Sequence, residues 1–545
     1  MSQIGKPPCD DAVILHGAEA TPCALSSRRW VLAAAILGSS MAFVDGTVVN
    51  VALPAIQHNL HATAFEAQWV VESYALFLAA LLLVGGSLGD RYGRRRIFAS
   101  GVALFAAASV GCALSRDVHQ LIVARAIQGI GAALLVPGSL ALISASFTEK
   151  ERGRAIGTWS GFSGITAAIG PVLGGFLVDH YSWVWAFLIN VPLAVVVLAI
   201  AWWRVPESRS VSATGGLDAW GALLATLALG GIVYAFIEAP TLQWGSTTVL
   251  TSLVVGISAA VAFVVVERRA RSPMLPLGLF RIRNFGGTNL LTLLLYAALG
   301  GGLFFFPLNL IQVQGYSATA AGAALLPFIL IMFVLSRWAG TLVDRVGSRL
   351  PLLVGPVIAA GGFALFALPG VEADYWSTFF PAVAVLGIGM TVTVAPLTTT
   401  VMNSVGADFA GVASGINNAV ARTAALLAIA VFGMVMAWAF DASLHESLRE
   451  AHVSHEISVF LDAQRSMLAG AALPPAVDAE AAATLRRAVE LSYVSGFRWI
   501  MLLSAGLALM SAVAAGVLID GNKRPQTLSQ PGRQPRAVGR DRRPR

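Results

Sequence analysis

Long apolar runs alternate with short polar turns along nearly the whole chain. A helix that crosses a hydrocarbon core of roughly 30 Å needs about 20 apolar residues, and about fourteen runs come close to that length. The runs lie near residues 30–52, 67–88, 97–114, 118–143, 157–178, 183–203, 219–237, 247–266, 288–310, 320–340, 352–368, 379–397, 412–440 and 497–519. This pattern predicts an all-α polytopic membrane protein of about fourteen transmembrane helices.

Composition agrees with this prediction, because 57% of the 545 residues are hydrophobic and only 12% are charged, which excludes an ordinary soluble globule. The net charge of +7 does not indicate nucleic acid, since Lys and Arg recur in alternate short loops, as cytoplasmic loops do. The intervening loops 55–66 and 240–246 contain no Lys or Arg. We therefore predict that both termini are cytoplasmic, and that the first span inserts the chain without a cleaved signal peptide.

A ten-residue pattern, G-x-L-x-D-R-x-G-x-R, occurs at residues 86–95 and again at residues 340–349. The first copy follows the second apolar run and the second copy follows the tenth. If the two copies mark equivalent points of two six-helix bundles, then two further helices must be inserted between the bundles. Such repeated halves are common in transporters. The predicted parts are an N-terminal tail (1–29), a first bundle (30–204), two inserted helices with a linker (205–287), a second bundle (288–519) and a basic cytoplasmic tail (520–545).

One long segment of the second bundle, residues 441–496, is too polar to span a membrane. Its apolar residues recur at near-helical spacing: Leu444, Leu448, Ile457, Phe460 and Leu461. We interpret the segment as one or two amphipathic helices at the periplasmic surface. A connector is the simplest role, and a lid or a partner surface would have the same pattern.

Three charged residues lie inside the apolar runs of the first bundle: Asp45, Glu72 and Arg125. Such a residue costs at least about 2.5 to 3.5 kcal/mol in a bilayer, so it is usually paired and functional. At 1.5 Å per residue, each lies roughly 7 to 11 Å from the outer end of its helix. Arg125 favours an ionised carboxylate and apolar burial favours a protonated one. We predict proton or cation handling by Asp45, with Glu72 as a second such site, against the alternative of a static charge cluster.

Other polar residues in the runs give weaker signals. Asn309, Gln312, Asn417 and Arg422 either line a substrate cavity or hydrogen-bond neighbouring helices together. The fifth run is crowded with Gly161, Gly164, Gly170, Pro171, Gly174 and Gly175. Small residues allow close helix contact and proline allows a bend, so this run suits a gate.

Several motifs are absent from the sequence. Without a G-x-x-x-x-G-K-[ST] phosphate loop, ATP is not expected as the direct energy source. Without H-E-x-x-H, G-x-S-x-G or a cysteine pair, we expect neither an enzyme nor a cofactor, metal or disulfide framework; the cysteines are Cys9, Cys23 and Cys112. An ion gradient is the remaining energy source, at about 2.3 kcal/mol per charge moved through 100 mV.

These motifs resemble those of the major facilitator superfamily, in its fourteen-span drug/proton antiporter branch typified by the EmrB and QacA pumps. The loop between spans two and three matches at Gly86, Leu88, Asp90, Arg91, Gly93, Arg94 and Arg95, with a second-half echo at Gly340, Asp344, Arg345 and Gly347. The resemblance implies a charge relay there that biases the inward and outward states. The first-span motif matches at Asp45, Thr47, Asn50 and Pro54.

Two further motifs extend the resemblance. Arg125, Gln128, Gly129 and Gly131 match the fourth-span motif, whose arginine is associated with proton coupling. Gly157, Gly170, Pro171, Gly174 and Gly175 match the fifth-span antiporter motif, which is taken to separate exporters from importers. The chain departs from the branch at Thr166, at Val184, and at Thr423 and Ala424 after Arg422. These departures leave the substrate and the details of coupling open.

Together, the residues and the resemblance predict a proton-coupled exporter of amphipathic compounds in the bacterial inner membrane, working by alternating access. Its expected partners are protons, a small-molecule substrate, the lipid bilayer and, as an open question, a periplasmic adaptor protein. A transporter of one specific metabolite or antibiotic is the main alternative. A non-transporting sensor on the same fold is the other.

Overall fold

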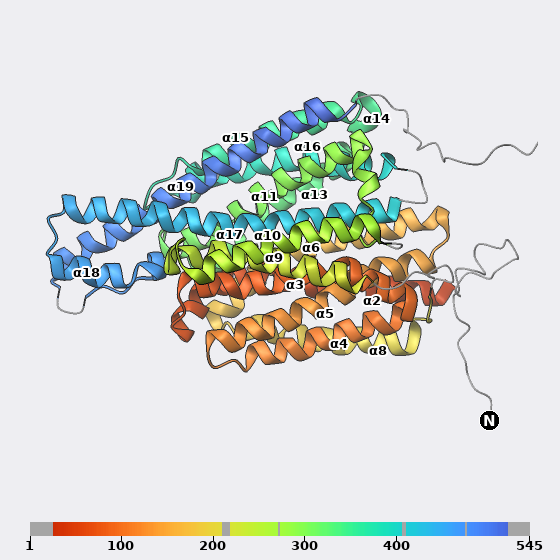
Figure 1. Ribbon diagram of the computed structural model, residues 1–545, viewed down its shortest axis with the longest axis horizontal. Helices are drawn as coiled ribbons and strands as arrows, with labels where there is room; N and C mark the ends of the chain where they lie inside the picture. The colour runs from red at the N-terminus through yellow and green to blue at the C-terminus, as the bar shows by residue number, and fades with distance from the viewer. Residues whose placement is uncertain (1–24, 210–217, 271–272, 406–409, 475–476, 521–545) are drawn as a thin grey trace, which may run out of the picture.

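The computed structural model describes residues 25–209, 218–270, 273–405, 410–474 and 477–520. Every regular element within these ranges is a helix, and the long helices run side by side along the long axis of the molecule (Figure 1). Fourteen helical segments of the described chain are long and apolar enough to cross a membrane. The predicted fold class, an all-α polytopic membrane protein, is therefore confirmed.

The first six apolar runs form the helices α2 (Leu25–Leu60), α3 (Ala64–Tyr92), α4 (Arg94–Ala113), α5 (Val118–Ser146), α6 (Glu149–His180), and α7 (Trp185–Leu188) with α8 (Asn190–Arg204). Local sequence sets their starts. Thr63 and Glu66 form a reciprocal capping box at the start of α3, and the Asp117 side chain caps α5. The sixth run is divided at Ile189 into two helices.

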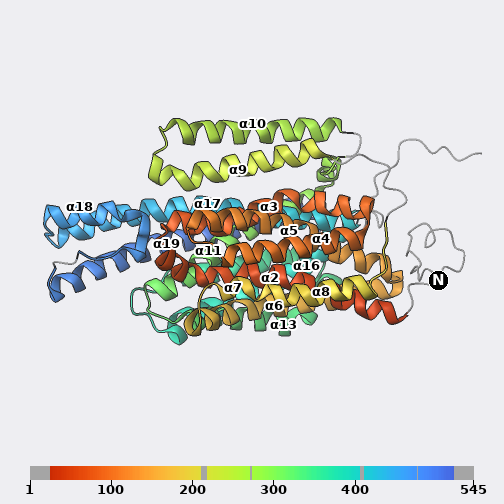
Figure 2. The same cartoon turned by 90° about the horizontal axis from the view of Figure 1, so that it is seen from below.

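The next two runs form α9 (Ala219–Leu242) and α10 (Thr247–Arg269), which lie to one side of the other helices (Figure 2). Helix α9 packs against α3 and α17 as well as against α10. Helix α10 exposes apolar side chains such as Val254 and Val261, which are 62% and 60% exposed. An apolar exposed face of this kind suits contact with lipid.

The rest of the described chain forms η1 (Leu277–Arg281), α11 (Arg283–Gln312), α12 (Ala318–Ala323), α13 (Leu326–Gly340), α14 (Leu342–Val346), α15 (Arg349–Phe366), η2 (Tyr375–Phe379), α16 (Phe380–Asn403), α17 (Ala410–Glu450), α18 (His455–Ala463), η4 (Arg465–Gly470) and α19 (Ala479–Leu518). The tenth run is broken between α12 and α13. The N-terminal tail with Cys9 and Cys23, and the basic tail after Asp520, lie outside the described residues.

The polar segment 441–496 differs in part from its expected form. It contains one short helix of the expected kind, α18, but it also continues α17 to Glu450 and starts α19 at Ala479, and both of these helices project beyond their neighbours (Figure 1). Leu444, Leu448 and Leu461 are buried against the main core. We call the described part of this segment the outer hairpin. The end of the molecule that carries it is called the outer end, and the opposite end is called the inner end.

Candidate functional site

A buried ion pair joins α2 to α5. The carboxylate of Asp45 and the guanidinium of Arg125 are both 0% exposed, and Arg125 Nη1 donates to Asp45 Oδ2 over 2.5 Å. The second oxygen, Oδ1, accepts from Gln128 Nε2 at 2.8 Å and from Asn190 Nδ2 at 3.0 Å. Both carboxylate oxygens are therefore hydrogen-bonded, as a buried charge requires.

The arginine is fixed by groups on α3 and on its own helix, α5. Its Nε donates to the Val70 carbonyl at 2.9 Å, and its Nη1 donates to Gln128 Oε1 at 2.6 Å. Its guanidinium carbon lies 4.2 Å from the centre of the Tyr74 ring, in a cation–π contact. We call Asp45, Ser109, Arg125, Gln128 and Asn190 the polar cluster; Ser109 Oγ completes it by accepting from Gln128 at 2.9 Å.

Two members of the polar cluster, Ser109 and Asn190, were not predicted from the sequence. Asn190 is 0% exposed and begins α8, where the sixth run is interrupted. An Asn inside an apolar run was an available signal, but nothing in the sequence says that it meets Asp45, which lies 145 positions away in the chain. The helix packing alone brings these residues together.

The geometry of the pair restricts how it can exchange protons. Protonating Asp45 in place would leave the Arg125 charge buried without its counter-charge, which is strongly unfavourable. The charges of Asp45 and Arg125 therefore depend on each other, and both depend on the packing of α2, α5 and α8.

Glu72 does not join this pair. Its side chain is 0% exposed, and neither carboxylate oxygen has a hydrogen-bond partner among the described residues. Its neighbours one helical turn away on α3 are Gln68 and Leu76. Gln68 donates to the Ile429 carbonyl of α17 at 3.0 Å, and Leu76 packs against α9 and α17. Arg125 pairs with Asp45 and not with Glu72, so the expectation that such a charged residue is paired is wrong for Glu72 among the described residues.

The residues predicted to bind substrate have different environments. Asn417 donates to Thr292 Oγ1 at 2.7 Å and to Asn289 Oδ1 at 3.2 Å, so it ties α17 to α11. Asn309 is 1% exposed, and its Oδ1 has no partner among the described residues. Arg422 is half-buried on α17, close enough to Tyr74 of α3 to interact with it electrostatically.

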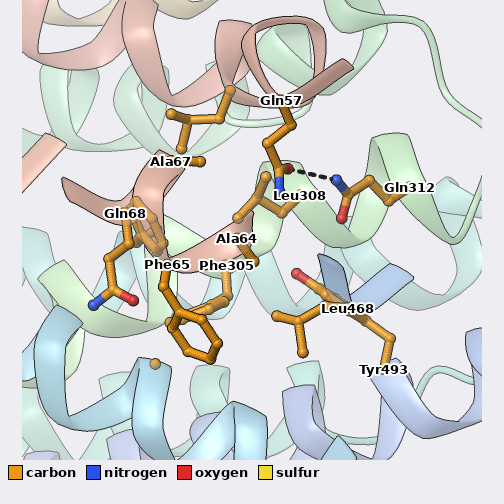
Figure 3. Close-up of a pocket in the computed structure, with 13 residues that line it drawn as sticks. Gln57, Ala64, Phe65, Ala67, Gln68, Phe305, Leu308, Gln312, Leu468 and Tyr493 are labelled. Atoms are coloured by element: carbon orange, nitrogen blue, oxygen red, sulfur yellow. Dashed lines mark hydrogen bonds between the residues drawn. The ribbon is translucent and has the colours of Figure 1, made fainter. Parts of the chain in front are cut away.

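Gln312, by contrast, joins α11 to α2 at the outer end. Its Nε2 donates to Gln57 Oε1 of α2 at 2.9 Å, as the dashed line in Figure 3 shows. The two amides line a cavity of about 20 Å³ together with Phe65, Leu468 and Tyr493. This volume holds about one water molecule. We call this the central cavity; α2 and α11 are in direct contact beside it.

A second closure joins α6 to α12. Asp179, near the end of α6, accepts from the backbone N–H groups of Ala318 and Thr319 at 3.0 and 2.8 Å, and so caps the start of α12. A Cβ added to Gly175 would meet the carbonyl oxygen of Ala318, and one added to Gly322 would meet that of Pro171. The antiporter-motif glycines thus allow direct backbone contact at the outer end. Asp179 was not predicted from the sequence.

The inner half of α6 is open. A Cβ added to Gly157, Gly161 or Gly164 would meet nothing within 4 Å. Phe162 and Ile169 on the same stretch are 49% and 48% exposed. The predicted crowding of glycines therefore has two different consequences, tight contact at the outer end of α6 and free space toward its inner end.

The loop motif forms a docked turn at the inner end. Asp90 pairs with Arg94 at 2.8 Å, and the backbone N–H of Arg95 donates to Glu207 at 3.0 Å. Gly93 has φ 113°, and an added Cβ would lie 2.8 Å from the carboxyl carbon of Glu207. The sequence did not single out Glu207, which lies 112 positions from Arg95.

The second-half copy of the motif is less fully described. Gly347 also has positive φ, at 78°, so both copies turn at their second glycine. Arg345 is exposed, and a Cβ added to Gly340 would meet nothing within 4 Å. The Asp344 side chain lies outside the described part of the structure, so the charge relay expected at this copy stays a prediction.

We expect Gly93→Ala to undock the inner turn. The change forces a non-glycine residue into a rare backbone region and against Glu207, at a cost of order 1 to 3 kcal/mol. Thermal unfolding of the purified protein should occur at a lower temperature, and transport should slow. Gly506→Ala, in α19, is the matched control, since its Cβ would meet nothing within 4 Å. Equal stability and transport in the two variants would contradict this account of the turn.

Known proteins share both the sequence pattern and the fold. Residues 35–430 match the family model described as Major Facilitator Superfamily. The chain is 33% identical over 512 residues to the tetracenomycin C resistance and export protein of Streptomyces glaucescens, and the match covers 92% of this chain and 93% of that protein. It is 36% identical to the multidrug resistance protein Stp of Mycobacterium tuberculosis (76% and 77% covered) and 37% identical to the puromycin resistance protein of Streptomyces alboniger (76% and 84%).

Solved structures add agreement at the level of the fold. A bacterial homologue of the human lysosomal transporter Spinster aligns with a TM-score of 0.63 at 18% identity, covering 91% of this chain and 97% of that one. A D-xylose–proton symporter aligns with a TM-score of 0.57 at 14% identity, covering 92% and 99%. The family model spans most of the chain and the relatives are transporters rather than enzymes, so this chain belongs to the Major Facilitator Superfamily.

Proposed function

We propose that this transporter exports amphipathic small molecules in exchange for protons. The relatives named for drug and antibiotic resistance support export, as do the close contacts of the antiporter-motif glycines. The proposed exchange for protons rests on the buried pair of Asp45 and Arg125. Further hydrogen bonds from α5 and α8 leave no unpaired oxygen on the carboxylate. A gradient-driven antiporter needs a group of this kind within the membrane.

In the proposed cycle, residues 30–204 and 288–519 are the two moving bundles, and 205–287 is the insertion between them. A proton that enters from outside binds Asp45, which releases Arg125 from its carboxylate partner. The freed guanidinium then pairs with other acceptors as the helices move, and the proton leaves toward the cytoplasm. The substrate moves outward in the opposite half of the cycle.

The inner turn belongs to the same proposal. Its Asp90–Arg94 pair and the Glu207 contact hold the inner ends of α3, α4 and the chain after α8 together. We propose that Gly86, Asp90, Arg91, Gly93 and Arg94, with Gly340, Asp344, Arg345 and Gly347, bias the two states without touching substrate. Asn309, Gln312, Asn417 and Arg422 are proposed to line the substrate path, with Asn417 acting through helix contact in the state observed.

The proposed location is the inner membrane of a bacterium, with both termini in the cytoplasm, because Lys and Arg are concentrated in the loops of the inner end. The outer hairpin then lies in the periplasm. It is the surface that a periplasmic adaptor protein would meet, and cross-linking from the outer hairpin in whole cells tests for such a partner.

The decisive experiment measures proton release from acidified inside-out vesicles that contain the protein. Adding an exported compound should release protons, and vesicles without the protein should not respond. Growth of expressing cells on a panel of dyes and antibiotics then separates broad export from export of one compound. Binding of a compound without any movement across liposomes would favour the sensor and reject the proposal.

We expect Glu72→Gln to affect cationic substrates more than neutral ones. An unpaired buried carboxylate needs a proton or a cation to compensate its charge, and the amide removes that need. Export of a lipophilic cation should fall by about tenfold, the effect of 1.4 kcal/mol, with a smaller change for a neutral compound. Glu66→Gln, at the partly exposed capping box of the same helix, is the control. Equal losses for both substrate types would contradict a cation-binding role.

A further inference from the structure

A second cavity lies at the outer end, on the side of the molecule where α9 packs. It has a volume of about 220 Å³, compared with about 20 Å³ for the central cavity of Figure 3. Its walls come from α3, from α17, from the end of α9 with the turn that follows it, and from η4 of the outer hairpin. We call it the side cavity.

Phe65 lines both cavities. It is the second residue of α3 and is 6% exposed. Beside it, Gln68 donates to the Ile429 carbonyl, and a Cβ added to Gly433 would meet the Gln68 side chain. Phe65 therefore borders both cavities, and α3 and α17 are in close contact beside it.

The body of the side cavity is aromatic. Trp244 is held edge-on by Phe236 at a centroid distance of 5.7 Å, and Trp438 is held by Trp499 at 6.2 Å. Gln243, with φ 64°, makes the turn that presents Trp244 beside the end of α9. Two indole rings at one rim form apolar walls for a flat molecule and also attract cations through their faces.

The polar end of the side cavity carries both signs of charge. Asp441 lines it from α17, and its Oδ1 is buried without a hydrogen-bond partner among the described residues; the ring nitrogen Nδ1 of His445 lies 3.7 Å from this oxygen. Arg465 lines the opposite wall from η4 and is exposed. An ammonium group would satisfy the carboxylate, and an acceptor oxygen would satisfy the guanidinium.

We infer that the side cavity is a second binding station for the exported compound, next to the central cavity, with Phe65 bordering both. The ligand class is an amphiphile with a flat apolar body and a polar end that carries an ammonium nitrogen and an acceptor oxygen. This inference rests on the proposed export function. It assigns a role to α9, because α9 and its turn supply the outer wall of the station.

The test uses full-length protein in lipid nanodiscs and rhodamine 6G, a flat aromatic cation with ester oxygens. Ala437→Trp fills the side cavity from α17. Equilibrium dialysis should show two rhodamine sites on the wild-type protein and one on the variant. Asp441→Asn should weaken the second site by about tenfold, equivalent to 1.4 kcal/mol. Val261→Trp, on the exposed face of α10, is the matched control and should keep both sites.

Three results would overturn the inference. The first is a wild-type protein that binds one rhodamine, and the second is an Ala437→Trp protein that still binds two. The third is a phospholipid that co-purifies in the side cavity and is not displaced by rhodamine 6G, which would assign the same chemistry to a lipid headgroup. Failure of the export proposal is distinguishable, because it would abolish transport by the wild-type protein whatever the number of binding sites.

Discussion

Asp45→Asn is expected to abolish coupled transport. The amide cannot carry the proton, and it leaves the Arg125 charge buried without a counter-charge. Breaking a buried pair in this way costs about 3 to 5 kcal/mol, so the variant should also unfold at a lower temperature. Drug-stimulated proton release from vesicles, corrected for the amount of folded protein, should fall to the level of vesicles without the protein.

A double variant separates coupling from stability. Asp45→Asn with Arg125→Gln removes both charges and keeps polar side chains at both positions, so it should recover much of the lost stability. It should not recover proton release. Undiminished coupled export by a well-folded Asp45→Asn protein would remove Asp45 from the mechanism, and recovery of coupling in the double variant would reduce the pair to a structural role.

Gly175→Ala is expected to hold the outer end open. The new Cβ would meet the carbonyl oxygen of Ala318, which is backbone and cannot move aside without shifting α12. The closed contact between α6 and α12 should therefore be lost, and export should fall by at least about tenfold, which requires only 1.4 kcal/mol. A reporter thiol introduced by Thr319→Cys, with the native cysteines replaced by serine, should react faster with an impermeant maleimide added from outside.

Gly161→Ala on the same helix is the matched control. Its Cβ would meet nothing within 4 Å, and the exchange of glycine for alanine favours the helix by up to about 1 kcal/mol. This variant should transport normally and leave the labelling rate of the reporter thiol unchanged. If the two alanine variants behave alike, close contact at Gly175 is not what closes the outer end.

The sequence was most informative about features that depend on residue type within a short stretch of chain. A run of apolar residues must be buried in lipid or protein wherever it lies, so the fourteen spans could be read from the chain alone. The cost of a charge in a bilayer likewise marked Asp45, Glu72 and Arg125 as unusual. The family resemblance rests on short motifs, and the match to the Major Facilitator Superfamily confirms it.

The prediction failed where an outcome depends on the direction in which a side chain projects. Glu72 and Arg125 share a depth, but Glu72 lies on the face of α3 toward α9 and α17, whereas Arg125 contacts the backbone of Val70. The polar segment 441–496 looked like surface helices because its charges interrupt the apolar pattern. In the structure α17 enters the segment as far as Glu450 and α19 begins at Ala479, with α18 and η4 between them, and buried leucines of these helices pack on the core.

The sequence by itself therefore determined the membrane class, the number of spans, the family resemblance and the charged residues that need a partner. Only the tertiary structure decided which partners they have: Asn190 and Ser109 beside Asp45, Glu207 beside the Gly93 turn, and Asp179 at the start of α12. The physical reason is that apolar burial and charge cost depend on residue type, whereas a hydrogen bond depends on positions set by helix packing between segments far apart in the chain.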